Sequence, residues 1–371
     1  MKRTKRVAKL VASSIVLCSF AGIIIVGKKQ RLLAYKRPIP ILEALPADYI
    51  ASNDYGSIVS SNDHLIPRAT VEHITLNVPK TKFGDEKIVR HGRVVYYPHA
   101  QATILICHGF MTDKYDVGFL RHLFPQGKYN FMTFDFRAHG DNCNDQCCTL
   151  GRDEALDVIT AGHFIKTHSQ LKDKPVIVYA FSMGAVAAIE AQSQDNSLFS
   201  AMILDCPFDS SENMIKRSLE NLQFTFLGYD FSVPACNLLQ KYAFHPYVQA
   251  LIKGILKTIS HFDTKNIDVR IYPINPAQSA QEIDVPCLFI HCKNDEKISV
   301  QAVKTIYECC GSCYKKLWLT NGRRHFDSYF YNPEQYIKEV RGFIETVVNK
   351  TYSNKPKEQI IEDQDELLAQ I

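Results

Sequence analysis

The chain has 371 residues, of which 46% are apolar and 22% are charged, with 17 Gly and 16 Pro. This composition is typical of a globular protein with one large domain or two small ones. The formal charge of +4 is unevenly spread, because residues 1–37 hold ten Lys or Arg and no Asp or Glu. The rest of the chain has 33 basic and 39 acidic residues, which argues against a basic surface for nucleic acid.

The basic segment 1–37 contains an apolar run, LVASSIVLCSFAGIIIVG, over residues 10–27. This run is just long enough to span a bilayer. A cleaved signal peptide is the alternative, because Ser19-Phe20-Ala21 resembles a cleavage site, but the apolar run continues beyond it to Val26. We therefore expect one uncleaved anchor and a membrane-anchored protein. Five basic residues lie before the run and five soon after it, so the charges favour neither orientation.

The 12 cysteines include two clusters, CNDQCC over residues 143–148 and CCGSC over residues 309–313. A zinc site is one interpretation, but no nearby His stands at the spacing of a zinc finger or ribbon. Free thiols, or one or two disulfides, are favoured instead. Cysteines inside or beside apolar runs are interpreted as small buried hydrophobic residues; these are Cys107, Cys206, Cys287 and Cys292.

Residues 38–70 are interpreted as a linker, after which strand and helix patterns alternate up to residue 349. The strand-like segments are residues 71–79, 87–98, 102–109, 129–137, 174–181, 199–208, 285–295 and 314–321. The helix-like segments are residues 117–124, 151–168, 183–192, 300–310 and 333–348. This alternation predicts a doubly wound, mostly parallel sheet with helices on both faces.

The alternation is interrupted over residues 207–276, a segment that is helical in character and rich in Phe and Tyr. We interpret it as a cap inserted over the carboxyl edge of the sheet, where open α/β sheets bind their ligands. Residues 350–371 are polar and charged, and we expect a mobile tail there.

In YAFSMGAVAA, over residues 179–188, Ser182 stands between a strand pattern and a helix pattern. A nucleophilic serine needs a tight turn with small residues two positions away on each side, and here these are Ala180 and Gly184. The dipole of the following helix favours a developing negative charge. A helix N-cap is an equally good interpretation of this stretch taken alone.

Two later segments favour the nucleophile. Asp295 follows a buried strand, and His325 lies in the loop after the next strand. The chain order Ser, acid, His is that of a serine nucleophile at a strand-to-helix turn, and all three positions lie at the carboxyl edge of the sheet. Glu296 is the rival acid. An oxyanion hole then requires two backbone N–H groups, for which we choose Met183 and Phe110, with Met111 as the alternative to Phe110.

The stretch FDFRAHGDN, over residues 134–142, is a second polar cluster. A metal site or a second catalytic site is conceivable there. We favour a hydrogen-bonded loop scaffold in which Asp135 and His139 brace the backbone.

Seven segments resemble, in this order, the α/β-hydrolase superfamily: ICHGF, FDFRAHGDN, TLGRDEALDV, AFSMGAVAA, LDCPF, NPAQSAQEIDVPCLFIHCKND and NGRRHF. Within it, the chain is similar to bacterial serine hydrolases of the esterase and serine-aminopeptidase-like type, several of which carry an N-terminal membrane segment. The resemblance covers residues 71–349. It implies an α/β-hydrolase fold with an eight-stranded sheet and a helical cap, a Ser182–Asp295–His325 triad, no metal and no diffusible cofactor. One departure is Ala180, where Gly is usual.

The expected reaction is two-step acyl transfer through an acyl-enzyme on Ser182. An aromatic cap and a membrane anchor favour a carboxylesterase or lipase-like enzyme with a small-molecule or lipid-like acyl substrate. The alternatives are a serine peptidase and a non-catalytic, membrane-anchored binding module on the same fold.

Overall fold

The computed structural model describes residues 69–141, 146–220, 223–226, 229–232, 241–245, 247–250, 267–322, 324–352 and 357–363. The expected anchor at residues 10–27 and nearly all of the expected linker lie outside these ranges. Among the helices that are described, none has both the length and the apolar character needed to cross a bilayer.

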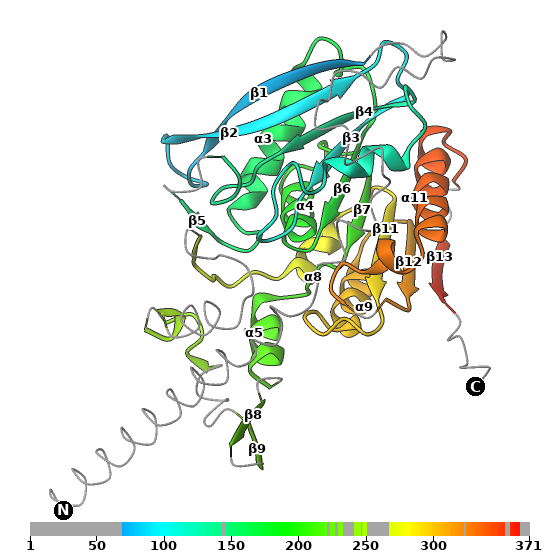
Figure 1. The fold of residues 1–371 in the computed structure, drawn as a ribbon. Coiled ribbons are helices and arrows are strands. Elements are labelled where there is room, and N and C mark those ends of the chain that lie inside the picture. The colour runs from blue at the N-terminus through cyan, green and yellow to red at the C-terminus, as the bar shows by residue number, and fades with distance from the viewer. Residues whose placement is uncertain are drawn as a thin grey trace, which may run out of the picture. The chain divides into compact units, whose positions relative to one another are not determined.

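The described residues contain a nine-stranded sheet (Figure 1). In spatial order its strands are β1 (Thr70–Pro79), β2 (Lys87–Tyr96), β4 (Tyr129–Phe134), β3 (Ala102–Cys107), β6 (Val176–Phe181), β7 (Ala201–Asp205), β11 (Cys287–Cys292), β12 (Tyr314–Thr320) and β13 (Lys357–Glu362). The pairs β1–β2 and β2–β4 are antiparallel, and every other neighbouring pair is parallel. The doubly wound, mostly parallel sheet is therefore confirmed, with one strand more than the expected eight.

The additional strand, β13, corrects the expectation of a mobile tail for residues 357–363. β13 pairs in parallel with β12 at the edge of the sheet. Asp363, which follows it, accepts a hydrogen bond of 2.8 Å from Nε1 of Trp318. The segment KEQIIE is polar enough to be mistaken for a tail, but polar side chains are usual on an edge strand because one side of it faces water.

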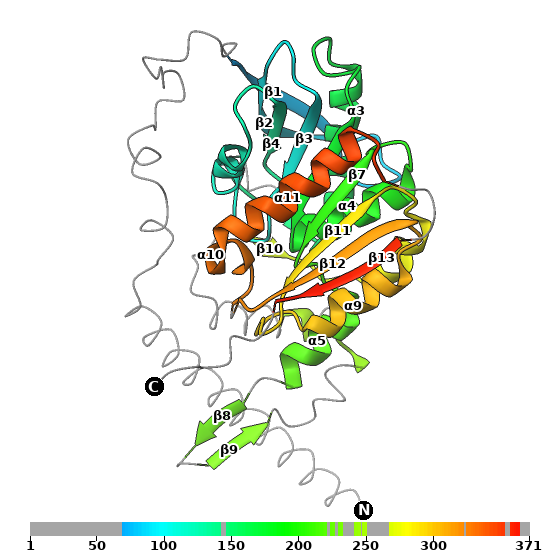
Figure 2. The same cartoon turned by 90° about the vertical axis from the view of Figure 1, so that its right-hand side faces the viewer.

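Helices cover both faces of the sheet (Figure 2). One face packs against α3 (Glu154–Thr167), α4 (Met183–Gln194) and α9 (Val300–Cys309); the other packs against η1 (Gly118–Leu123) and α11 (Pro333–Val348). The central strands alternate between the two cores, since Val178 and Ala180 of β6 face the first and Ile177 and Tyr179 the second. This alternation is the two-residue period of a strand whose faces are both buried.

Several short elements complete this unit. They are β5 (Cys147–Cys148), β10 (Asp268–Val269), α8 (Pro276–Ser279), η4 (Ala280–Glu282) and α10 (Ser328–Tyr331). β5 and β10 pair in parallel, so the CNDQCC segment contributes backbone to a small sheet. The cysteines of the described ranges carry free thiols, which is one of the two alternatives expected from the sequence; the other was one or two disulfides.

Residues 211–266 belong to a separate compact unit. Its described elements include α5 (Ser211–Glu220), β8 (Gln223–Phe226) and β9 (Tyr229–Ser232). β8 and β9 form an antiparallel hairpin in which Phe224 is paired with Phe231 and Phe226 with Tyr229. The helical character expected for residues 207–276 is therefore wrong at this hairpin, because aromatic residues favour strands, where they pair across the ladder.

Candidate active site

The structure brings Ser182, His325 and Asp295 together at the carboxyl edge of the sheet. Nε2 of His325 lies 2.8 Å from Oγ of Ser182, and Nδ1 of His325 lies 2.6 Å from Oδ2 of Asp295. With a neutral imidazole, Nδ1 donates to the carboxylate and Nε2 accepts from the hydroxyl. This is the hydrogen-bonding order that a general base needs in order to take the proton of a serine hydroxyl.

Ser182 lies between the last residue of β6 and the first residue of α4. Its backbone has φ 50° and ψ −115°, a combination that residues other than glycine rarely adopt. Although Ser182 occupies the N-cap position, its side chain makes no capping hydrogen bond. The N-cap interpretation therefore does not account for this hydroxyl, which points to His325 instead.

Asp295 follows β11, and its carboxylate is held on both sides. Oδ1 accepts hydrogen bonds from the backbone N–H groups of Lys297 and Ile298, while Oδ2 accepts from His325. Burial alone would raise the pKa of Asp295, but the hydrogen bond and the charge of His325 outweigh it and lower the pKa below its usual value. The rival acid, Glu296, is exposed to solvent.

The backbone N–H groups of Met183 and Phe110 are the oxyanion donors that the sequence predicts. Met183 is the first residue of α4, so its N–H group has no acceptor within the helix. Phe110 follows Gly109, and a Cβ atom added to Gly109 would lie 3.6 Å from Cβ of Ser182. The loop that carries Phe110 therefore passes beside the serine, and Met111 in the same loop has a positive φ of 67°.

His108 holds this loop in place through two hydrogen bonds. The N–H group of Phe136 donates to Nε2 of His108 over 3.0 Å, so Nδ1 carries the proton and donates to the carbonyl oxygen of Gly109 over 2.8 Å. Burial, and then the neighbouring His139, lower the pKa of His108 well below its usual value. A neutral ring with a fixed tautomer is what these two hydrogen bonds require.

The described part of this cluster, residues 134–141, is a hydrogen-bonded loop scaffold, as expected. Oδ1 of Asp135 accepts from the N–H group of Lys114, and Oδ2 accepts from its ammonium group. Nδ1 of His139 lies 2.8 Å from the carbonyl oxygen of Arg137, so the ring donates to the backbone. The Lys114 bonds tie the loop after β3, which also carries Phe110, to the end of β4, and the His139 bond braces the loop after β4.

The sequence interpretation missed Asp205 and Cys206 as neighbours of this site. Sγ of Cys206 lies 3.8 Å from Nε2 of His325, and the carbonyl oxygen of Asp205 accepts a hydrogen bond of 2.8 Å from the N–H group of Ser182. The sequence pattern predicts Cys206 only as a small buried hydrophobic residue. The available signal was the segment LDCPF, which ends a parallel strand at the same edge of the sheet as Ser182.

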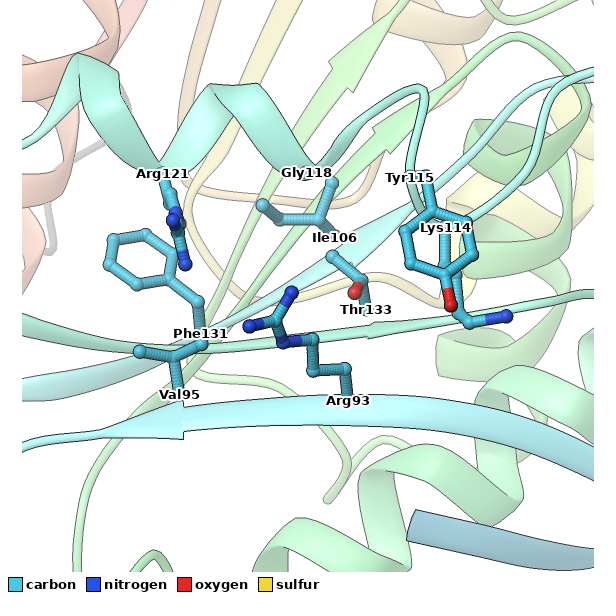
Figure 3. A pocket seen from close by; sticks show the side chains of 9 residues that line it. All are labelled: Arg93, Val95, Ile106, Lys114, Tyr115, Gly118, Arg121, Phe131 and Thr133. Atoms are coloured by element: carbon cyan, nitrogen blue, oxygen red, sulfur yellow. The ribbon is translucent and has the colours of Figure 1, made fainter. Parts of the chain in front are cut away.

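A small, partly open pocket lies between η1 and the strands β2, β4 and β3. Its lining residues are Arg93, Val95, Ile106, Lys114, Tyr115, Gly118, Arg121, Phe131 and Thr133. Arg93 and Arg121 point their guanidinium groups into it, whereas the ammonium group of Lys114 is turned away (Figure 3). That ammonium group is paired with Asp135 and Asp141. The pocket contains none of the three triad positions.

Comparison with known proteins agrees with this architecture. Residues 98–229 match the serine aminopeptidase S33 family. The chain is 26% identical to YqkD of Bacillus subtilis (strain 168) over 252 residues, which are 67% of this chain and 73% of the relative.

Solved structures with the same fold include the Pyrococcus furiosus esterase Pf2001, at 19% identity and a TM-score of 0.54, with 75% of this chain and 93% of that chain covered. The 2,6-dihydroxy-pseudo-oxynicotine hydrolase has a TM-score of 0.53 at 15% identity, with 78% of this chain and 71% of that chain covered. The sheet order, the turn at Ser182 and these likenesses together show that the chain has the α/β-hydrolase fold.

Proposed function

We propose that this protein is a serine hydrolase that cleaves carboxylic esters through an acyl-enzyme on Ser182. The observation that carries the proposal is the continuous hydrogen-bonded chain from Ser182 Oγ through His325 to Asp295, with distances of 2.8 and 2.6 Å. A helix N-cap or a packing histidine would need neither contact. The positive φ of Ser182 supports the same role, because it holds the hydroxyl clear of the edge of the sheet.

In the first step, Ser182 Oγ attacks the carbonyl carbon and His325 Nε2 takes the hydroxyl proton. The resulting oxyanion accepts hydrogen bonds from the N–H groups of Met183 and Phe110. His325 then gives its proton to the leaving alkoxide, and the ester bond breaks. In the second step, His325 takes a proton from water, the hydroxide adds to the acyl group, and the acid leaves as Ser182 recovers its proton.

The ester is favoured over the amide as the natural substrate because the similar solved structures include an esterase. The match of residues 98–229 to the serine aminopeptidase S33 family favours an amide of an amino acid or peptide as the second candidate. Purified enzyme assayed against p-nitrophenyl esters of increasing acyl length, beside aminoacyl amides, separates the two. Because a serine peptidase also cleaves activated esters, the amides decide. Ester turnover without turnover of any aminoacyl amide supports the first proposal, and turnover of an amide with a kcat/KM comparable to that of the esters overturns it in favour of the second.

We also propose that residues 10–27 anchor the protein in a membrane, on the basis of the apolar run alone. The full chain should stay with membranes after an alkaline carbonate wash, while a variant without residues 1–37 should be released. Release of both forms by the wash would overturn the proposal.

A further inference from the structure

Asp205 lies at the centre of the carboxyl edge, between the strand that leads to Ser182 and the strand that leads to Asp295. It is the last residue of β7 and is paired with Phe181 of β6 and Ile290 of β11. Its carbonyl oxygen accepts the N–H group of Ser182, and the next residue, Cys206, has its thiol 3.8 Å from Nε2 of His325. A change in the position of Asp205 therefore reaches Ser182 through the backbone and His325 through Cys206.

The carboxyl group of Asp205 is almost entirely buried, with only 1% of the residue exposed. Oδ2 accepts a hydrogen bond of 2.8 Å from the hydroxyl of Tyr336 in α11, and that hydroxyl lies 2.6 Å from the hydroxyl of Tyr179 in β6. Oδ1 makes no hydrogen bond to any described residue. An ionised carboxylate in an apolar core normally has every oxygen satisfied, so this half-satisfied group favours the neutral acid.

The surrounding charges act in the same direction. Burial raises the pKa of Asp205 to about 7, the hydrogen bond from Tyr336 and the adjacent Cys206 thiol oppose this rise, and the negative charge of Asp295 adds to it. The titratable groups that interact with Asp205 are Tyr336, Tyr179, Asp295, Cys206 and Cys292, and His325 lies on the other side of the Cys206 thiol. Burial also raises the pKa values of the two thiols and the two phenols, so these four groups are neutral when Asp205 titrates.

We propose that Asp205 is a positioning residue of the active site, whose carboxyl group exchanges a proton in the pH range where the hydrolase activity develops. The proposal rests on the proposed function of Ser182, His325 and Asp295. When Asp205 is ionised, its negative charge favours the protonated imidazole of His325, which cannot take the hydroxyl proton. When Asp205 is neutral, this opposition disappears. The two groups therefore compete for a proton, and the competition broadens the rise of activity with pH.

The test is the pH dependence of kcat/KM for a p-nitrophenyl ester in the wild type and in Asp205→Asn, which keeps the shape of the side chain and removes its proton. We expect the acid limb of Asp205→Asn to move to lower pH by about 0.5–1 unit and to follow a single proton. Tyr336→Phe removes the donor to Oδ2 and favours the neutral acid, so its acid limb should move the same way.

Glu190→Gln is the matched control. Glu190 is a carboxyl group of α4 whose pKa is also raised, chiefly by burial, and its only described hydrogen-bonding partner is the hydroxyl of Ser279. The acid limb of the Glu190→Gln profile should coincide with that of the wild type. A loss of kcat/KM by the same factor at every pH in Asp205→Asn, with an unmoved acid limb, would mean that Asp205 is merely structural.

A second measurement separates this inference from the proposed function. In a Ser182→Ala background, which has no hydrolysis to measure, Asp205→Asn should still raise the urea midpoint of unfolding, and by more at pH 8 than at pH 5. If the wild type hydrolyses no ester but Asp205→Asn raises the urea midpoint more at pH 8 than at pH 5, the proposed reaction is wrong, while the inference that Asp205 holds a proton in the fold stands. If the difference is absent, the inference about Asp205 fails whatever the activity.

Discussion

Gly184 packs so closely against His108 that a Cβ atom added to Gly184 would lie 2.4 Å from the carbonyl oxygen of His108. The next contact of such an atom would be the carbonyl oxygen of Cys107, at 2.7 Å. Both are backbone atoms at the end of β3, and they cannot rotate away. Between the first turn of α4 and the loop that carries Phe110 there is therefore room only for the hydrogen atom of a glycine. This explains why a glycine stands two residues after Ser182.

Gly184→Ala should lower both stability and activity. The added methyl group forces α4 and the loop apart, which costs about 1–3 kcal/mol of unfolding free energy and displaces an oxyanion donor. A displacement of about 1 Å at a reacting centre lowers kcat about 100-fold. Thermal unfolding and ester hydrolysis measure the two effects.

Ala180→Gly is the control for that variant. Ala180 lies two residues before Ser182, in the core beside Cys107 and Leu204, and its methyl group is fully buried. The change should cost about 0.5–1 kcal/mol and leave kcat within a few-fold of the wild type. A larger loss of kcat in Ala180→Gly than in Gly184→Ala would contradict this account of the turn.

Gly322 and Cys292 should be coupled in a double-mutant cycle. A Cβ atom added to Gly322 would lie 2.6 Å from Sγ of Cys292, so Gly322→Ala should push the His325 loop outward and lower kcat. Cys292→Ala removes the sulfur and should restore much of the activity to the double variant, with a coupling energy of about 0.5–3 kcal/mol. Additive losses in the cycle would show that the sulfur is not what excludes a side chain at position 322.

Asp295→Asn should lower kcat by about 10³–10⁴-fold, because an amide no longer stabilises the charged imidazole. Glu296→Gln, the exposed neighbour, should leave kcat unchanged. The pKa of Asp295 is lowered in the fold, so its contribution to stability is present above the usual pKa of about 4 and is lost as the pH falls through the lowered value. Asp295→Asn should therefore destabilise the protein more at pH 7 than at pH 3, as measured by urea unfolding.

The contribution of Asp205 to stability depends on pH in the opposite sense to that of Asp295. The pKa of Asp205 is raised to about 7 in the fold, so between about pH 4 and pH 7 the unfolded chain loses this proton while the folded chain keeps it. The folded state is therefore destabilised progressively as the pH rises through that window, by up to about 4 kcal/mol. Asp205→Asn should remove this loss. If the difference in unfolding free energy between the variant and the wild type were the same at pH 5 and at pH 8, the raised pKa of Asp205 would be contradicted.

The three triad positions were predictable because parallel strands place their carboxyl ends at one edge. A hydroxyl, an acid and an imidazole that follow three such strands lie at the same edge of the sheet, where the loops can bring them together. The choice of Asp295 over Glu296 depended on burial, which the structure supplies: Asp295 receives two backbone N–H groups and Glu296 faces solvent.

Other features depend on packing that no local pattern encodes. Asp205 and Cys206 lie beside the triad because β7 sits between β6 and β11. The segment LDCPF indicates that they lie at the carboxyl edge, but not that they lie beside the histidine. β13 is short and polar, so its pairing depends on the free edge of β12 rather than on its own residues. The hairpin β8–β9 was obscured because the aromatic residues around it suggested a helical cap.

Covalent labelling of Ser182 tests the central claim most directly. Wild-type protein, Ser182→Ala and Glu190→Gln are each treated with a fluorophosphonate probe, and the adduct is measured by intact mass and located by peptide mapping. Because the Ser182 side chain does not cap α4, Ser182→Ala should unfold at the same temperature as the wild type. We expect one adduct on Ser182 in the wild type and in Glu190→Gln, and none in Ser182→Ala. An unlabelled wild type, or an adduct that persists in folded Ser182→Ala, would contradict the account.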